Sequence, residues 1–133
     1  MAQVALLNDE LEAGRRMIEE LRATGFEVVA AFWARLADDN AWNLYLASPA
    51  VEKQGRDAYL KVYATIDRMP ELGLDSYDVK LLRTDDAMAK AALEAVQAKP
   101  EFTGITRFRG TSLGGVSVDG AYIYPQPQSV PTA

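Results

Sequence analysis

The stretch of sequence that decides the fold is residues 42–49, WNLYLASP. Its first part places an apolar side chain at every second position, which is typical of a β-strand with one buried face. Ser48 and Pro49 then match the start of a helix, because serine caps a first turn and proline is tolerated within that turn. The sequence therefore predicts a strand over 42–47 that leads into a helix.

The preceding residues, 26–36, alternate in the same way and predict another strand. A helix is the alternative for this stretch, because some of its apolar residues also recur at helical spacing. Between the two strands, residues 38–40 read Asp-Asp-Asn, which is typical of a turn. Together these features predict a β-hairpin over 26–47.

An amphipathic helix is predicted before the hairpin, over about 8–24. Apolar residues recur there at steps of three and four, as in a helix that buries one face. Asn8 is its predicted N-cap, and acidic residues follow at the positive end of the helix dipole. Gly25 is predicted just beyond its end, where a left-handed backbone costs glycine nothing.

Two more helices are predicted after the hairpin, with a strand between them. Helical spacing of apolar residues supports both helices, and strict alternation supports the strand. The second helix is predicted between Ser48 and Pro70, with Gly55 as an alternative, later start. The strand is predicted over 77–81. The third helix is predicted over about 86–98, with Thr84 or Asp85 as its N-cap and Lys99-Pro100 after its end.

The last third of the chain is predicted to be β-structure. Residues 105–109 form a strand and residues 110–115 form a loop. Residues 116–124 form either two strands joined by a tight turn at Asp119-Gly120 or one strand that bulges there, because Asp-Gly is typical of tight turns. The remaining residues, 125–133, are rich in proline and glutamine and favour an extended polyproline conformation.

The resulting element order is α-β-β-α-β-α-β-β. It predicts an α+β fold with three helices and a five- or six-stranded, mainly antiparallel sheet that is covered by helices on at least one face. The length of 133 residues fits a single domain. We expect that domain over 1–124, followed by a Pro/Gln-rich tail over 125–133.

Two segments of the chain resemble other proteins. Residues 42–49 and 114–125 are similar to segments of short bacterial proteins without an assigned function. The likeness extends over about 25–125. It implies a bacterial origin and a self-contained domain, and it brings no activity and no functional residue with it.

The chain contains no cysteine and no histidine. The first absence excludes disulfides, thiolate nucleophiles and cysteine-bound zinc. The second removes the commonest general base near neutral pH and the commonest ligand of transition metals. Any metal would have to be an oxygen-bound ion such as magnesium. We predict no cofactor, no metal site and no catalytic residue.

The net charge of the chain is −5. Nucleic-acid-binding domains usually carry a basic excess or a basic stripe, so binding to nucleic acid is not expected. No apolar run approaches the roughly 20 residues that span a bilayer, and the first residues lack the pattern of a secretion signal. We therefore expect a cytoplasmic protein without membrane contact.

Aromatic and basic side chains alternate with the predicted core positions of the strands. If they share the outer face of the sheet, they form one aromatic and basic surface. Such a surface could be solvated or covered by a helix, could be a protein interface, or could bind an anionic ligand. The candidate interaction residues are Trp33, Arg35, Tyr45 and Lys80, with Asn43, Arg107 and Arg109 on the same predicted face.

A second candidate site is the glycine-rich loop after residue 109. Its backbone N–H groups and hydroxyls could converge on an anion, although the chain lacks the ending of a phosphate-binding P-loop. An ordinary hairpin loop is the alternative interpretation. The candidate anion-binding residues are Arg107, Arg109, Thr111, Ser112, Gly114 and Gly115.

The absence of catalytic signals and the predicted aromatic surface favour a non-enzymatic protein-interaction or accessory domain. Its expected partner is another protein or a second copy of the chain. The alternative is a protein, or an enzyme, that binds a small anion or nucleotide through Arg107, Arg109 and residues 111–115.

Overall fold

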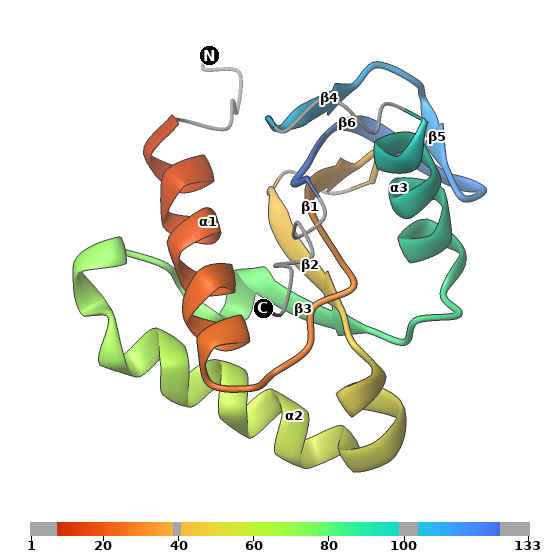
Figure 1. Cartoon of the computed structure of the whole chain (residues 1–133). Coiled ribbons are helices and arrows are strands. Elements are labelled where there is room, and N and C mark those ends of the chain that lie inside the picture. The colour runs from red at the N-terminus through yellow and green to blue at the C-terminus, as the bar shows by residue number, and fades with distance from the viewer. Residues whose placement is uncertain (1–7, 39–40, 99–103, 126–133) are drawn as a thin grey trace, which may run out of the picture.

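The computed structural model describes residues 8–38, 41–98 and 104–125, and its described part contains three α-helices and a six-stranded mixed sheet (Figure 1). This confirms the predicted α+β class, the mainly antiparallel sheet and the order of the elements. The helices are α1 (Asn8–Ala23), α2 (Pro49–Arg68) and α3 (Ala87–Gln97), and the strands are β1 (Ala30–Leu36), β2 (Asn43–Ala47), β3 (Val79–Leu82), β4 (Thr106–Phe108), β5 (Ser112–Leu113) and β6 (Val116–Ile123).

The helix boundaries follow local chemistry. Ser48 caps α2, because its Oγ accepts a hydrogen bond from the backbone N–H of Ala50 at 3.1 Å. Gly25 follows α1 with a φ of 90°, as its predicted role requires. The cap of α3 is Asp86, not Thr84 or Asp85, because the Asp86 carboxylate accepts from two N–H groups of the first turn. The predicted cap residue is thus one or two positions too early.

The strand order in the sheet is β3-β2-β1-β6-β4, and β5 pairs with β6 outside this path. All pairs are antiparallel except β2 with β3. The predicted hairpin is confirmed: β1 and β2 pair from Ala30 opposite Ala47 to Ala34 opposite Asn43. Residue 26 lies before β1, so this strand is shorter than predicted.

Residues 116–123 form one strand. Of the two predictions for this segment, the single strand with a bulge is therefore correct, and the tight turn at Asp119-Gly120 is wrong. Arg35 pairs with Gly120 and its neighbour Leu36 pairs with Val118, so Asp119 is the extra residue of a bulge. The tight turn lies instead at Gly114-Gly115, between β5 and β6.

Helices cover both faces of the sheet. Trp33 lies opposite Leu44 on β2 and Tyr122 on β6, so these residues share the face that packs against α1 and α2. Phe32 and Tyr45 share the opposite face, which packs against α3. Figure 1 shows α3 across the sheet from α1 and α2. The core is therefore divided into two layers by the sheet.

None of the helices in the described ranges is long and apolar enough to cross a membrane. The predicted end of the third helix at Lys99-Pro100 lies outside the described residues, as do residues 126–133 of the predicted tail.

Candidate functional site

The structure distributes the predicted interaction residues over two faces of the sheet. Trp33 and Arg35 are on the side of α1 and α2, with Arg107, because Arg107 pairs with Tyr122 and Tyr122 pairs with Trp33. Tyr45 lies opposite Phe32 and beside Lys80, on the side of α3. The predicted residues therefore do not form one common surface.

Burial separates these residues further. Trp33 is 1% exposed and Tyr45 is 7% exposed, so both are core residues in this structure. Arg35 is half-buried and Lys80 is exposed. The signal for the buried strand was present in the sequence: residues 30–34 are an unbroken apolar run, which indicates a strand buried on both faces.

Two of the predicted basic residues, Arg35 and Arg107, share the α1 and α2 face, but the aromatic rings near Arg107 belong to residues that were not predicted there, Tyr122 and Trp42. The guanidinium carbon of Arg107 lies 5.9 Å from the centroid of the Tyr122 ring. The rings of Tyr122 and Trp42 follow, with centroids 5.6 Å apart. Arg35 lies on the same face, and within the described residues its buried Nε has no hydrogen-bond partner.

The glycine-rich loop forms a two-residue hairpin turn. Leu113 pairs with Val116, and the two glycines between them have φ values of 62° and 85°. Gly114 also packs against the backbone of Ala87 at the start of α3. The glycine-rich segment is thus an ordinary hairpin loop, which was the alternative interpretation of its sequence.

Two of the predicted anion-binding residues, Arg107 on β4 and Ser112 on β5, lie beside distant positions of β6. Arg107 pairs with Tyr122, whereas Ser112 pairs with Ser117, five residues away on the same strand. Five residues of strand span about 17 Å. Arg109, Thr111 and Ser112 are exposed. The structure therefore does not gather the arginines and the loop around one point.

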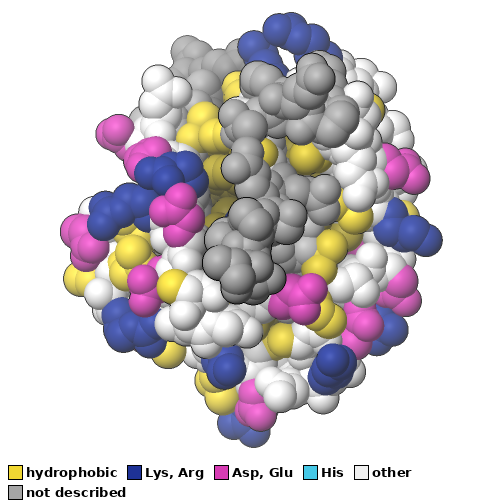
Figure 2. All heavy atoms as spheres, viewed as in Figure 1, with side chains coloured by type: hydrophobic (Ala, Val, Ile, Leu, Met, Phe, Trp, Pro, Cys, Tyr) yellow, Lys and Arg dark blue, Asp and Glu magenta, His cyan; other side chains and the backbone are white. Residues whose placement is uncertain are grey.

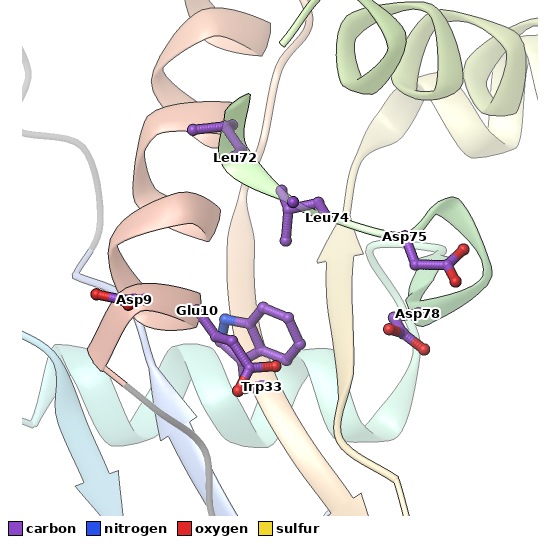
Figure 3. Close-up of a pocket in the computed structure, with 8 residues that line it drawn as sticks. Asp9, Glu10, Trp33, Leu72, Leu74, Asp75 and Asp78 are labelled. Atoms are coloured by element: carbon purple, nitrogen blue, oxygen red, sulfur yellow. The ribbon is translucent and has the colours of Figure 1, made fainter. Parts of the chain in front are cut away.

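A pocket of about 80 Å³ lies between the start of α1, strand β1 and the segment that joins α2 to β3 (Figure 3). Trp33 supplies its aromatic wall. The residues that line it are Asp9, Glu10, Trp33, Leu72, Gly73, Leu74, Asp75 and Asp78. The pocket therefore combines an apolar surface with four carboxylates.

Short local structures hold the segment that closes the pocket. Residues 70–72 and 76–78 form two single turns of 3₁₀-helix, η1 (Pro70–Leu72) and η2 (Ser76–Asp78). Gly73 ends η1 with a φ of 70°, which favours glycine. Asp75 caps η2, because its Oδ1 accepts from the N–H of Tyr77 at 2.9 Å. These two turns place Leu72, Leu74 and Asp78 along the pocket.

Hydrogen bonds hold the indole of Trp33 in place. Its Nε1 donates to the hydroxyl oxygen of Tyr124 at 2.8 Å, and that hydroxyl donates to the carbonyl oxygen of Leu11 at 2.7 Å. Gly14 leaves the space for this pair, because a side chain there would meet both the indole and the phenol. The aromatic wall is thus a rigid part of the core.

The electrostatics of the pocket favour a positive charge. The pKa of Asp78 is raised, first by partial burial and then by the negative charges of Asp75 and Glu10, while Lys80 acts in the opposite direction. Like charges raise the pKa of a carboxyl group because ionisation adds to their repulsion. A cation in this field would relieve that repulsion.

The carboxylates surround the pocket rather than converge on one point. In the view of Figure 3, the indole lies between Asp9 and the pair Asp75 and Asp78. Within the described ranges, no group of three or more acidic side chains is arranged to hold a metal ion. The arrangement suits a cationic organic group, which can place its apolar part against the half-buried Leu72 and Leu74 and its charge near the carboxylates.

Sequence reasoning missed this pocket. Asp9 and Glu10 fit the acidic first turn of a helix, and residues 71–76 read as a plain loop. The pocket unites segments that are far apart in the chain, so no local motif marks it.

Comparisons with protein-family models, with curated proteins and with solved structures found no match.

Proposed function

We propose that this protein is a non-enzymatic interaction domain that binds a basic side chain of a partner protein in the pocket beside Trp33. The observation that carries the proposal is the combination of an apolar lining, Leu72 and Leu74 over the buried Trp33, with four carboxylates in one pocket. A lysine or arginine side chain has the matching composition, because its methylene stem is apolar and its end is charged.

The size of the pocket favours a side chain over a metabolite. Its volume is about 80 Å³, whereas pockets for drug-sized ligands are roughly 300–1,000 Å³. The end of one long side chain fits such a space, and a nucleotide does not. The proposal therefore concerns a protein partner that inserts one residue.

An exposed tyrosine supports recognition at this surface. Tyr77 is 83% exposed and stands between Asp75 and Asp78 in the chain. Tyrosine is enriched among the residues that dominate the binding energy of protein interfaces. Tyr77 itself does not line the pocket, but its neighbours in sequence Asp75 and Asp78 do, so contact with this ring is a further expectation of the proposal.

The overall charge distribution agrees with a basic partner. The chain carries a net charge of −5, and such a charge attracts positively charged partners over a distance. Figure 2 shows basic and acidic side chains interspersed on the face viewed there, without a basic stripe. The attraction is expected to weaken as salt is added.

The test is a titration with N-acetyl-lysine methylamide and N-acetyl-arginine methylamide, followed by the fluorescence of Trp33 in a Trp42→Phe background. Saturable binding in the millimolar range is expected for at least one of them. The uncharged norleucine analogue is expected to cause no saturable change. Equal responses to the charged and uncharged analogues, or no response, would contradict the proposal.

Variants locate the binding within the protein. Asp78→Asn and Asp75→Asn are each expected to weaken binding about threefold or more, because each removes a charge at close range. Asp57→Asn is the matched control, since Asp57 is exposed on α2 and does not line the pocket. Equal affinity in all three variants would place the binding elsewhere.

Self-association stays a prediction, and it needs a surface other than Trp33 and Tyr45. Both side chains are buried, so charged substitutions there would unfold the domain instead of separating two copies. Tyr77→Glu is the informative variant. Light scattering is expected to show a dimer that this variant dissociates, and a monomer at every concentration would contradict self-association.

A second candidate function is the binding of a small anion or nucleotide near Arg107. It is favoured by one observation, the cation–π contact of 5.9 Å between the Arg107 guanidinium and the Tyr122 ring, on the same face as Arg35. Inorganic phosphate and ATP are then expected to raise the melting temperature, and Arg107→Ala to abolish the shift. Arg56→Ala, an exposed position on α2, is the control. No shift with either ligand would remove this candidate.

A further inference from the structure

The four carboxylates of the pocket form two groups, and the separation of these groups extends the proposed function. Asp9 and Glu10 belong to the first turn of α1. Asp75 caps the single turn η2, and Asp78 ends it. In the view of Figure 3, the Trp33 indole lies between Asp9 and the η2 pair, and Glu10 reaches toward the indole. The pocket therefore carries negative charge on two sides.

The apolar part of the pocket lies between the two groups. In the same view, the side chains of Leu72 and Leu74 stand between Asp9 and the η2 turn. Both leucines are half-buried, and Trp33 is 1% exposed. The methylene groups of a bound ligand would cover the leucines, and burial of apolar surface stabilises such a complex.

Three of the four carboxylates have no cation paired with them. Within residues 8–38, 41–98 and 104–125, Asp9, Asp75 and Asp78 take part in no salt bridge. The two groups also affect each other, because burial and then the charges of Asp75 and Glu10 raise the pKa of Asp78. A ligand with a positive charge at each end would relieve this repulsion on both sides.

A salt bridge connects the two sides of the pocket. Arg16 of α1 and Glu71 of η1 approach to 3.7 Å. Glu71 directly precedes Leu72, and η1 leads into the segment that carries Asp75. The spacing of the two carboxylate groups is thus set by the packing of α1 against the η1–η2 segment, and a preformed spacing favours a ligand of matching length.

We propose that the pocket binds a linear α,ω-diammonium ion, with one ammonium group beside Asp9 and Glu10 and the other beside Asp75 and Asp78. This inference rests on the proposed function, because it uses the same pocket and the same carboxylates. A short diamine has nearly the size of a lysine side chain, so the volume of about 80 Å³ suits it. The free diamine would compete with the basic side chain of the partner for this pocket.

A metal ion and a monoamine match the pocket less well. A metal ion has no apolar part, and in the described ranges no group of three or more acidic side chains is arranged to hold one. A monoamine places its single charge on one side and leaves the carboxylates of the other side without a cation. A ligand that is charged at both ends and apolar between them matches both sides and the leucines.

The test is a titration of the full chain with linear α,ω-diamines of three to eight carbon atoms, followed by Trp33 fluorescence in the Trp42→Phe background. Butylamine and magnesium chloride are the controls, because the first has one charge and the second has no apolar part. The best diamine is expected to bind about fivefold more tightly than butylamine, which exceeds the roughly twofold gain that two equivalent ends supply. It is also expected to displace N-acetyl-lysine methylamide.

The dependence on chain length separates a two-sided site from general attraction. All of these diamines carry the same charge, so their attraction to the net charge of −5 is the same. A site with a fixed spacing is expected to prefer one length and to bind clearly shorter or longer diamines about threefold less tightly. Affinity that only rises with length, or that is equal for every length and for magnesium, would overturn the inference.

Variants on the two sides provide the residue-specific measurement. Glu10→Gln and Asp78→Asn are each expected to weaken binding of the best diamine about threefold or more. Butylamine is expected to respond clearly to one of the two variants only, since its charge lies on one side. Asp9→Asn repeats the test on the α1 side. Asp57→Asn is the matched control, because Asp57 is exposed on α2 and does not line the pocket.

The possible outcomes separate the two proposals. If the lysine derivative binds and no diamine exceeds butylamine beyond the effect of its two equivalent ends, the inference is wrong and the proposed function stands. If one length of diamine binds and neither the lysine nor the arginine derivative does, the pocket is a diamine site and the proposed function is wrong. If the variants on both sides bind every ligand as the Asp57→Asn control does, both proposals are wrong.

Discussion

Trp33 and Tyr124 are 91 residues apart in the chain and share a buried hydrogen bond of 2.8 Å. The same tyrosine hydroxyl donates to Leu11 of α1. One hydroxyl group therefore connects the end of the sheet, the wall of the pocket and the first helix. Burial also raises the pKa of Tyr124, so this hydroxyl keeps its proton at neutral pH.

Tyr124→Phe is expected to lower the free energy of unfolding by about 1–3 kcal/mol, because it leaves the buried Trp33 N–H without its acceptor. Urea denaturation at pH 7 measures the change. Tyr77→Phe is the matched control, since Tyr77 is 83% exposed and loses only contact with water. A loss for Tyr77→Phe as large as that for Tyr124→Phe would contradict the assigned hydrogen bond.

The two glycines of the β5–β6 turn are expected to differ in their tolerance of a side chain. Both have positive φ, which costs any other residue about 1–2 kcal/mol. Gly115→Ala is expected to cost that amount, because no atom lies within 4 Å of its new Cβ. Gly114→Ala is expected to cost more, because its Cβ would overlap the carbonyl group of Ala87. Equal melting temperatures for the two variants would contradict this packing.

Glu52 on α2 is expected to stabilise the connection between β3 and α3 in a pH-dependent way. Its Oε1 accepts from the N–H of Thr84 at 2.7 Å and from the Thr84 hydroxyl. These bonds, with a smaller effect of Arg83, hold the pKa of Glu52 below its ordinary value. A lowered pKa gives stability above the ordinary value that is lost as the pH falls through the folded value.

Glu52→Gln is therefore expected to lower the urea midpoint slightly at pH 7. The difference from the wild type is expected to shrink as the pH falls through the lowered pKa of Glu52, and so to be smaller at pH 2 than at pH 7. Denaturation curves at the two pH values measure it. A difference that persists unchanged at low pH would show that the charge of Glu52 has no part in the effect.

The effect of Asp78 on stability is expected to change with pH in the opposite direction to that of Glu52. Its pKa is raised in the folded state by burial and by Asp75 and Glu10, so its contribution to stability falls as the pH rises from the ordinary pKa to the folded one. Asp78→Asn is expected to raise the melting temperature at pH 7 and to have less effect near pH 3. The same change is expected to weaken binding of the lysine derivative. A variant that is both less stable and equally able to bind would contradict the role of this carboxylate.

The predicted order of elements came from signals that act over a few residues. Ser48 and Pro49 mark the start of α2, and the alternation before them marks β2. The register between strands is set instead by contacts across the sheet. When the alternation of each strand is interpreted separately, Leu44 is assigned to the core face and Trp33 to the outer face. In the hairpin Trp33 pairs with Leu44, so the two side chains lie on the same face.

The candidate site was harder to predict than the fold because its parts are distant in sequence. Asp9, Trp33 and Asp78 each have an ordinary local explanation, as a helix end, a strand residue and a turn residue. Only the packing of α1 and the η1–η2 segment over β1 brings them to one pocket. The predicted convergence of the anion-binding residues was wrong for the same reason. Arg107 and Ser112 are near in sequence, but they pair with positions of β6 that are five residues apart.

The position of β6 has a consequence for the synthesis of the protein. β6 lies between β1 and β4, and β1 belongs to the first third of the chain. On the ribosome, β1 and β2 can pair early, but one side of β1 waits for residues 116–123 to emerge. The sheet therefore closes late in translation, and contacts between such distant segments favour slow folding. Until then one side of the apolar run over 30–34 has no partner strand, and an unpaired apolar strand edge is prone to aggregation.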